Sequence, residues 1–99
     1  MPKEVRIRID KWLWHARFYR SRVLAQEAAE SGLVRLNGTR VLKSGHALKC
    51  GDIVTVPMSG QILAVRVVAF GQRRGPAAEA RQLYEIVAAN ALDPRPLGP

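Results

Sequence analysis

Apolar residues near the start of the chain recur at helical spacing. Successive steps of about 100° divide this segment into an apolar side and a side that mixes cations with aromatic rings. The apolar side holds Ile9, Trp12, Leu13 and Ala16, and the mixed side holds Lys11, Trp14, Arg17 and Phe18. We therefore predict a helix that begins at Lys11, with Asp10 as its N-cap. Trp14 should be at least partly accessible, whereas Phe18 should fold back beneath the next element.

A second predicted helix follows after a short break. Ser21 is a suitable N-cap for residues 22–31, and Gly32 supplies the left-handed residue that commonly ends a helix. The start of this helix presents unpaired backbone amides and a positive dipole end beside Arg20 and Arg22, which favours the binding of phosphate. An ordinary serine cap with two solvated arginines is the alternative interpretation.

Beyond the second helix the periodicity changes from helical to alternating, as is typical of strands with one buried face. The dipeptide Asn37-Gly38 predicts a tight turn between two short strands, residues 34–36 and Arg40–Leu42. Two valine-rich segments, separated by turn residues, predict further antiparallel strands. These segments are residues 53–56 and 62–70. The middle of the chain is therefore expected to form a ribbon with a basic tip and a small antiparallel sheet.

The pair Gly75-Pro76 breaks this pattern near the C-terminus. Pro76 suits the first turn of a helix, and we predict such a helix through Ala89. Residues 90–99 are rich in proline and are expected to form a loose tail. The whole pattern predicts a single α+β domain over residues 1–89, in which two short helices and a β-ribbon lie on a small antiparallel sheet with a C-terminal helix.

Positive charge is concentrated in the first half of this chain of 99 residues, whose formal net charge is +8. Residues 1–49 hold 11 Lys and Arg against 4 Asp and Glu, whereas residues 50–99 hold 5 against 4. Among the cations of residues 6–22 lie the rings of Trp12, Trp14, Phe18 and Tyr19. Arginine and lysine neutralise phosphates and flat rings stack on unpaired bases, so this pattern indicates a nucleic acid, with RNA first. The alternative is that the rings are core residues and the cations a solvated rim.

Other classes of function find less support in the sequence. No apolar stretch approaches the length of a membrane-spanning helix, and no apolar signal-peptide core is visible, so a cytoplasmic protein is expected. An anionic membrane surface is the alternative to nucleic acid as the polyanion that this basic segment would bind. Neither His15 nor His46 has an evident acidic partner for catalysis, and we expect no enzyme activity and no cofactor. The single Cys50 has no partners spaced for a disulfide or a metal and is interpreted as a packing residue.

A second basic segment, residues 71–75 (GQRRG), lies between the last predicted strand and the C-terminal helix. It lacks the lysine and the spacing of a phosphate-binding loop. The segment is therefore predicted to be a basic turn, whose two arginines either add a secondary RNA contact or are solvated.

Several segments in combination resemble a known RNA-binding domain. They are residues 8–14 (RIDKWLW), 16–22 (ARFYRSR), 32–38 (GLVRLNG), 51–52 (GD), 72–80 (QRRGPAAEA) and 83–85 (LYE). The first four resemble the domain first named for small-subunit ribosomal protein S4. The tryptophan pair, the ARF tripeptide and the last two segments resemble more narrowly the ribosome-associated heat-shock protein fifteen family. The resemblance runs from about Arg6 to Val87.

This resemblance implies a helix-helix-ribbon unit, the αL motif, whose basic face docks on structured RNA. In the family that RNA belongs to the large ribosomal subunit, especially free subunits that still carry a nascent chain on tRNA. The implied role is rescue or recycling after heat stress, without catalysis. The sequence ends without the long basic C-terminal extension found in some members, so any affinity which that extension supplies elsewhere is expected to be absent or replaced.

Matching the motif position by position assigns a set of RNA-binding residues. They are Arg8, Asp10 and Lys11 at the entry to the first helix, Arg17, Arg20, Ser21 and Arg22 at the helix junction, and Asn37, Gly38, Arg40 and Lys43 at and after the ribbon. Trp14 joins them as a candidate for base stacking. Asp10 is expected to orient backbone amides or an arginine rather than to contact phosphate. The family often has Lys-Pro-Ser after the ribbon, where this chain has Lys43, Ser44 and Gly45, so a looser loop is expected.

Other partners would use related features. Transfer RNA or messenger RNA would bind the same face, and DNA would bind it nonspecifically. A small ribosome-assembly or protein-interaction module would depend on apolar rather than basic surface. The domain also accompanies RNA-modifying enzymes, but these 99 residues leave no room for a catalytic domain beside it. We expect a monomer that binds ribosomal RNA of the large subunit through shape and phosphate contacts, with base stacking secondary.

Overall fold

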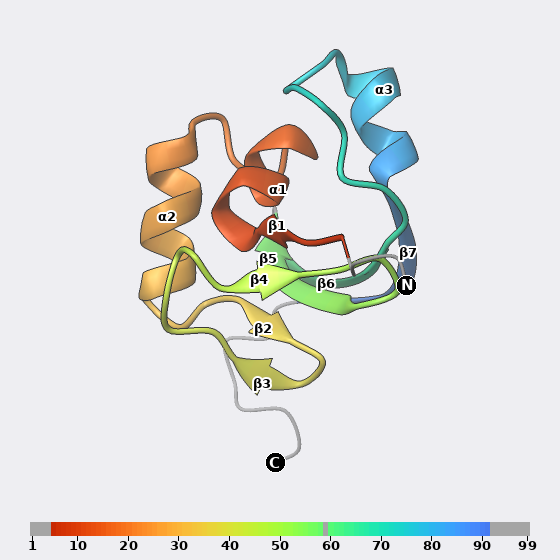
Figure 1. The fold of residues 1–99 in the computed structure, drawn as a ribbon. Coiled ribbons are helices and arrows are strands. Elements are labelled where there is room, and N and C mark those ends of the chain that lie inside the picture. Colours follow the sequence, from red (N-terminus) through yellow and green to blue (C-terminus); the bar gives the residue numbers. More distant parts are fainter. Residues whose placement is uncertain (1–4, 59, 92–99) are drawn as a thin grey trace.

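Two helices pack against an antiparallel sheet, and the hydrophobic core lies between them (Figure 1). The computed structural model describes residues 5–58 and 60–91. The helices are α1 (Ile9–His15), α2 (Arg22–Glu30) and α3 (Ala77–Ala80), and α3 continues into the 3-10 turn Arg81–Leu83. The strands are β1 (Ile7–Arg8), β2 (Arg35–Leu36), β3 (Thr39–Arg40), β4 (Ala47–Leu48), β5 (Ile53–Met58), β6 (Gln61–Val67) and β7 (Tyr84–Ala91).

Five strands form the main sheet in the order β3-β2-β5-β6-β7, with every neighbouring pair antiparallel. Strand β1 pairs with β4 in a separate two-stranded ribbon. Alternate residues of the two central strands are fully buried, Val54 and Val56 on β5 and Val65 and Val67 on β6. They belong to the same core cluster as Trp12 of α1. The predicted α+β class with a small antiparallel sheet is therefore confirmed.

Helix α1 begins two residues earlier than predicted, at Ile9 rather than Lys11. The backbone N–H of Ile9 donates to the His46 carbonyl at 2.8 Å, and that of Asp10 donates to the Ser44 carbonyl at 3.3 Å. These bonds satisfy two amides that an isolated helix would leave unpaired at its start. The assignment of Asp10 as N-cap is therefore wrong, because a distant loop supplies the caps and Asp10 lies inside the first turn.

The end of α1 is a Schellman turn with an arginine at its left-handed position. The N–H of Phe18 donates to the Leu13 carbonyl at 3.0 Å, and the N–H of Arg17 donates to the Trp14 carbonyl at 3.1 Å. Arg17 has φ 65°, a conformation that glycine usually provides at this position. The helix therefore stops before Arg17 and Phe18, which the periodicity had placed on its mixed side.

Phe18 folds back into the core, as predicted, and is only 6% exposed. Its ring centroid lies 5.9 Å from that of Trp12 and 4.8 Å from that of Tyr84. These tilted contacts join the end of α1 to the start of β7. Phe18 is therefore a packing residue and not a base-stacking surface.

The second helix and the ribbon closely follow the sequence prediction. The Ser21 hydroxyl accepts a hydrogen bond of 3.1 Å from the Leu24 N–H, which confirms the predicted cap. Gly32, just past the helix, has φ 84°. Asn37 and Gly38 both have positive φ, 51° and 86°, as the two-residue turn of a twisted hairpin requires.

The predicted C-terminal helix is wrong. Only Ala77–Ala80 is α-helical, and after the 3-10 turn the chain forms strand β7, which pairs with β6 along its whole length. A central strand of this length leaves a long unpaired edge, and pairing of that edge outweighs the helix propensity of the alanine-rich segment. Strand β7 extends to Ala91, and the rest of the predicted tail, residues 92–99, lies outside the described residues.

Cys50 is also placed differently from its prediction. Its side chain is exposed rather than packed in the core, and its thiol lies 3.4 Å from the Val68 carbonyl. Cys50 precedes Gly51, which has φ 94°, in the turn that leads into β5. This turn lies at the surface, so a small apolar side chain there is not drawn into the core.

Candidate nucleic-acid interface

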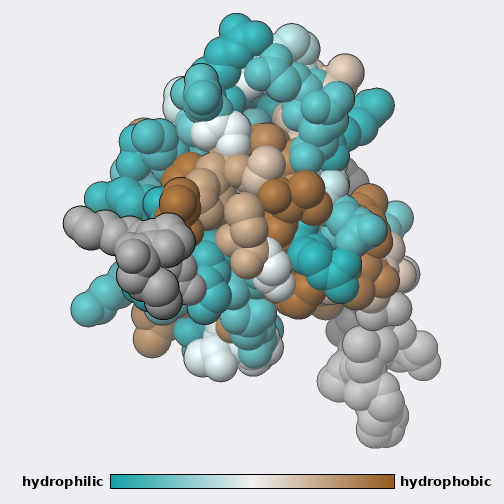
Figure 2. Space-filling view, turned by 45° about the vertical axis from the view of Figure 1, so that its right-hand side comes forward, coloured by the Kyte–Doolittle hydropathy of each residue, from teal (hydrophilic) through white to brown (hydrophobic). Residues whose placement is uncertain are grey.

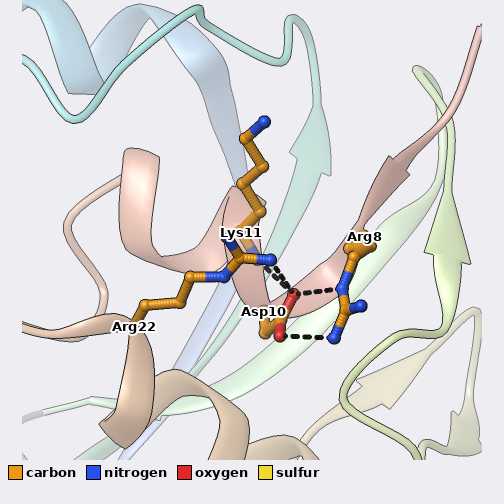
Figure 3. A network of polar contacts seen from close by, with 4 residues as sticks. All are labelled: Arg8, Asp10, Lys11 and Arg22. Atoms are coloured by element: carbon orange, nitrogen blue, oxygen red, sulfur yellow. Dashed lines mark hydrogen bonds and ion pairs between the residues drawn. The ribbon is translucent and has the colours of Figure 1, made fainter.

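The carboxylate of Asp10 is the centre of a charged network at the start of α1 (Figure 3). Its two oxygens accept hydrogen bonds from Arg8, at 3.2 Å from Nε and 3.0 Å from Nη2. The backbone N–H of Lys11 donates to the same carboxylate at 2.7 Å, and Nη2 of Arg22 lies 3.6 Å from Oδ1. One buried anion therefore fixes two arginines that come from different elements, β1 and α2.

Asp10 is fully buried, yet it is held in its charged form. Burial opposes ionisation most strongly, but the hydrogen bond from Arg8, the charge of Arg22 and the Lys11 N–H together outweigh burial and lower the pKa of Asp10. The carboxylate is therefore ionised at neutral pH. Its contacts are with backbone and arginine groups, which agrees with the orienting role expected for it.

The cations around Asp10 keep part of their surface in solvent. The side chain of Arg8 is 52% exposed and that of Arg22 is 38% exposed. Three further cations are exposed: Lys11 beside Asp10, Arg20 in the connection between the helices, and Lys43 in the loop whose Ser44 and His46 carbonyls accept from the start of α1. We define the basic face as Arg8, Lys11, Arg20, Arg22 and Lys43. The Asp10 carboxylate offsets only one of these five positive charges, so this face has an excess of positive charge.

The loop that carries Lys43 packs against the start of α1. The sequence analysis did not predict this contact. Its carbonyls at Ser44 and His46 accept the first two amides of α1. The Arg8 guanidinium lies over Gly45, where an added Cβ would be 3.4 Å from Cζ of the arginine. Gly45 therefore packs against the Arg8 guanidinium, a contact between distant segments of the chain that no local sequence pattern predicts.

The ribbon turn lies at the opposite end of the molecule from the connection between α1 and α2 (Figure 1). The Asn37 side chain donates to Asp52 at 3.1 Å and accepts from the Ile53 N–H at 2.9 Å. Asn37 and its neighbour Gly38 therefore shape the turn. Arg40 is exposed, but its aliphatic stem lies over Gly32, where an added Cβ would be 2.9 Å from Cδ.

Three remaining predicted residues have structural contacts of their own. Ser21 caps α2, and Arg17 donates a hydrogen bond of 2.6 Å from Nε to the Gly75 carbonyl. Trp14 is half-buried, with its ring centroid 5.7 Å from that of His15, so its predicted partial accessibility is confirmed. Trp14 also packs against the core cluster, so only part of its side chain is open to solvent.

Comparison with known proteins identifies the architecture. Residues 7–54 match the S4 domain family. The structure is similar to one described as the trimeric structure of Vibrio cholerae Heat Shock Protein 15, with a TM-score of 0.79 and 36% sequence identity over 85% of this chain and 84% of that one. The chain belongs to the S4-domain family of heat shock protein 15. The resemblance seen in the sequence is thereby confirmed.

Two further proteins are similar to this chain in sequence. Heat shock protein 15 of Escherichia coli K12 is 42% identical over 84 residues, which are 85% of this chain and 62% of that protein. The RQC P-site tRNA stabilizing factor of Halalkalibacterium halodurans is 31% identical over 80 residues, 81% of this chain and 89% of that protein. The chain therefore spans less than two thirds of the Escherichia coli relative but most of the second one.

The S4 match contains every residue of the basic face, but it ends before β6 and the segment that follows β6. Within residues 5–58 and 60–91, no helix is long and apolar enough to cross a membrane. The same residues contain no group of three histidine, cysteine or acidic side chains placed to hold a metal ion.

Proposed function

We propose that the basic face binds structured RNA of the large ribosomal subunit, in the rescue or recycling of stalled subunits under heat stress. The observation that supports this most strongly is the network around Asp10. A buried carboxylate that orients exposed arginines from two elements fixes the positions of their guanidinium groups before any ligand arrives. Preorganised cations lose little side-chain entropy when they bind phosphates, so they suit a rigid, structured RNA.

The binding mode follows from the residues of the face. Each arginine presents a planar fork that matches the oxygens of a phosphate, and Lys11 and Lys43 add point charges. Trp14 offers the accessible part of its ring to an unpaired base. Binding is therefore non-catalytic, depends on shape and phosphate spacing, and requires no cofactor.

The names of the relatives support a ribosomal partner. One relative is a heat shock protein and another is named for stabilising a tRNA in the P site of the ribosome. Transfer RNA is therefore the second candidate ligand for the same face, with nonspecific DNA as a weaker one. A ribosomal role would place the protein in the cytoplasm. We expected a monomer, whereas the Vibrio cholerae relative is described as trimeric, so the oligomeric state belongs in the same experiment.

Equilibrium binding to purified ribosomal particles tests the proposal. Labelled protein is titrated with bacterial large subunits, small subunits, total tRNA and a DNA duplex at one fixed salt concentration, and its oligomeric state is measured by light scattering. We expect the tightest binding to large subunits, and crosslinks to ribosomal RNA from the basic face. Equal affinity for all four ligands would show nonspecific electrostatic binding and would contradict the proposal.

A further inference from the structure

The loop between β6 and α3 lies at the same end of the molecule as the connection between α1 and α2 (Figure 1). Figure 2 shows hydrophilic side chains at this upper end and a band of apolar side chains below it. A groove beside α3 is lined by Met58, Leu63 and Tyr84, among other residues, and also by Arg17 and Arg81. A band of apolar side chains therefore borders the hydrophilic surface on its lower side in this view (Figure 2). This loop lies outside the residues that match the S4 domain.

Arg17 connects the end of α1 to the loop between β6 and α3. Its Nε donates to the Gly75 carbonyl at 2.6 Å, so the end of α1 holds the end of the loop. The backbone of Arg17 is left-handed, a conformation that is less favourable for arginine than for glycine. A side chain at this strained position that bonds to a distant carbonyl is a positioning device for the loop.

The loop itself carries two arginines in different states. Arg73 is exposed and forms an ion pair with Glu79 of α3, at 2.9 Å from Nη2 to Oε2. Arg74 is half-buried, and its Nε is buried without a hydrogen-bond partner among the described residues. Residues 73–81 hold three arginines, Arg73, Arg74 and Arg81, against one glutamate, Glu79. The loop therefore has an unsatisfied donor and a net positive charge.

We propose that Arg73 and Arg74 form a second phosphate contact for RNA, held in place by Arg17, so that the RNA-binding surface extends beyond the S4 domain. This inference rests on the proposed function of the basic face. Phosphate oxygens accept hydrogen bonds from the exposed Arg73 guanidinium and from the part of the half-buried Arg74 side chain that remains in solvent, and phosphate competes with the Glu79 carboxylate for Arg73. Each such contact releases counterions from the RNA.

Salt dependence of binding to large ribosomal subunits tests the second contact. The double variant Arg73→Ala/Arg74→Ala removes two phosphate contacts, so the slope of log affinity against log salt should become shallower by about 1.5. Arg66→Ala is the matched control, because Arg66 is also exposed and paired with a glutamate, Glu85 of β7. A slope that the double variant leaves unchanged overturns the proposal and assigns the loop to a protein partner or to solvent.

Substitution of Glu79 and Glu85, the partners of Arg73 and Arg66, gives an independent test in which affinity is expected to rise rather than fall. Glu79→Gln frees Arg73 and removes a nearby negative charge, so binding to large subunits should become several-fold tighter. Glu85→Gln makes the same chemical change beside Arg66, away from the loop, and should leave affinity unchanged. Equal gains from the two variants would show that only net charge counts and would contradict the assignment of a site.

A double-mutant cycle of affinities for large ribosomal subunits tests the positioning role of Arg17. Arg17→Gly relieves the left-handed backbone but removes the bond to Gly75, so the loop loses its anchor while the fold keeps its stability. Combined with Arg73→Ala/Arg74→Ala, it should add little further loss of affinity, because both changes act on one contact. Additive losses would show that Arg17 binds RNA independently and would overturn its role as the anchor.

The two proposals fail in distinguishable ways. If the wild-type protein does not bind large subunits at all, both the proposed function and the second contact are rejected. If the wild-type protein binds and Arg20→Glu abolishes binding, while the loop variants retain the full salt slope, only the second contact is rejected.

Discussion

The guanidinium of Arg22, the first residue of α2, lies 3.6 Å from the buried carboxylate of Asp10 in the first turn of α1. This contact joins the two helices across their connection. Arg22 therefore has two roles, because it holds the helices together through Asp10 and keeps 38% of its side chain exposed to solvent, although its Nε is buried. Arg20 lies two residues earlier in the connection and is exposed.

Charge reversal at these two arginines should have different consequences. Arg20→Glu should abolish RNA binding and leave the melting temperature unchanged. Arg22→Glu should abolish binding and also lower the melting temperature, because it places a second carboxylate beside a buried one. Arg22→Ala should cost about 1 kcal/mol or less, since the pair is screened by solvent on the side of the arginine. Equal melting temperatures for the two reversals would contradict the link through Asp10.

Asp10 should make stability depend on acid pH. Its pKa is lowered in the folded protein, so its stabilising contribution is complete above the ordinary value of 3.8 and is lost as the pH falls through the lower folded value. Asp10→Asn should therefore destabilise the protein at neutral pH, with a difference from wild type that shrinks in acid. Thermal unfolding at a series of pH values measures this difference, and one that stays constant into acid would refute the argument.

Substitution of the two tryptophans should have different effects, on folding stability for Trp12 and mainly on RNA affinity for Trp14. Trp12 is fully buried and donates from Nε1 to the Ala69 carbonyl at 2.8 Å, so Trp12→Ala should cost about 3–5 kcal/mol of folding stability. Trp14 is half-buried, and Trp14→Ala should cost less stability but weaken RNA binding by about tenfold through the loss of stacking. Trp14→Phe keeps a ring and should restore most of the affinity. Normal RNA binding by folded Trp14→Ala would remove Trp14 from the site.

Asn37 should act on the fold rather than on RNA. Asn37→Gly keeps the left-handed turn but removes the bonds to Asp52 and Ile53, and it should lower the free energy of unfolding by about 1–3 kcal/mol. RNA affinity of the folded variant, measured below its melting temperature, should be unchanged. A loss of affinity without a loss of stability would instead place Asn37 in direct contact with RNA.

Local signals in the sequence predicted the ribbon and the second helix because the chemistry that forms them is local. Asn37 and Gly38 tolerate positive φ, and Ser21 caps a helix through an N–H only three residues away. The same local reasoning gave the wrong prediction for the C-terminal segment, which forms strand β7 instead of a helix. Its alanines favour a helix, but Tyr84–Ala91 finds the edge of β6, a partner that no neighbouring residue reveals.

The candidate site was predicted in composition but not in arrangement. The sequence identified the cations and the orienting role of Asp10. It did not show that the loop after the ribbon would cap α1, because that contact joins Asp10 to Ser44 far along the chain. Nor did it show that Arg17 would take a left-handed conformation, since local propensity assigns that conformation to glycine.

The salt dependence of binding to large ribosomal subunits tests the central claim most directly, because it counts the phosphates that the protein neutralises. The five cations of the basic face predict that log affinity falls against log salt with a slope of about 4 or steeper. Arg20→Glu should abolish this binding, and Arg66→Glu should retain both the affinity and the slope. An affinity that does not change from low to physiological salt, or one that Arg20→Glu and Arg66→Glu weaken equally, would contradict an RNA interface on the basic face.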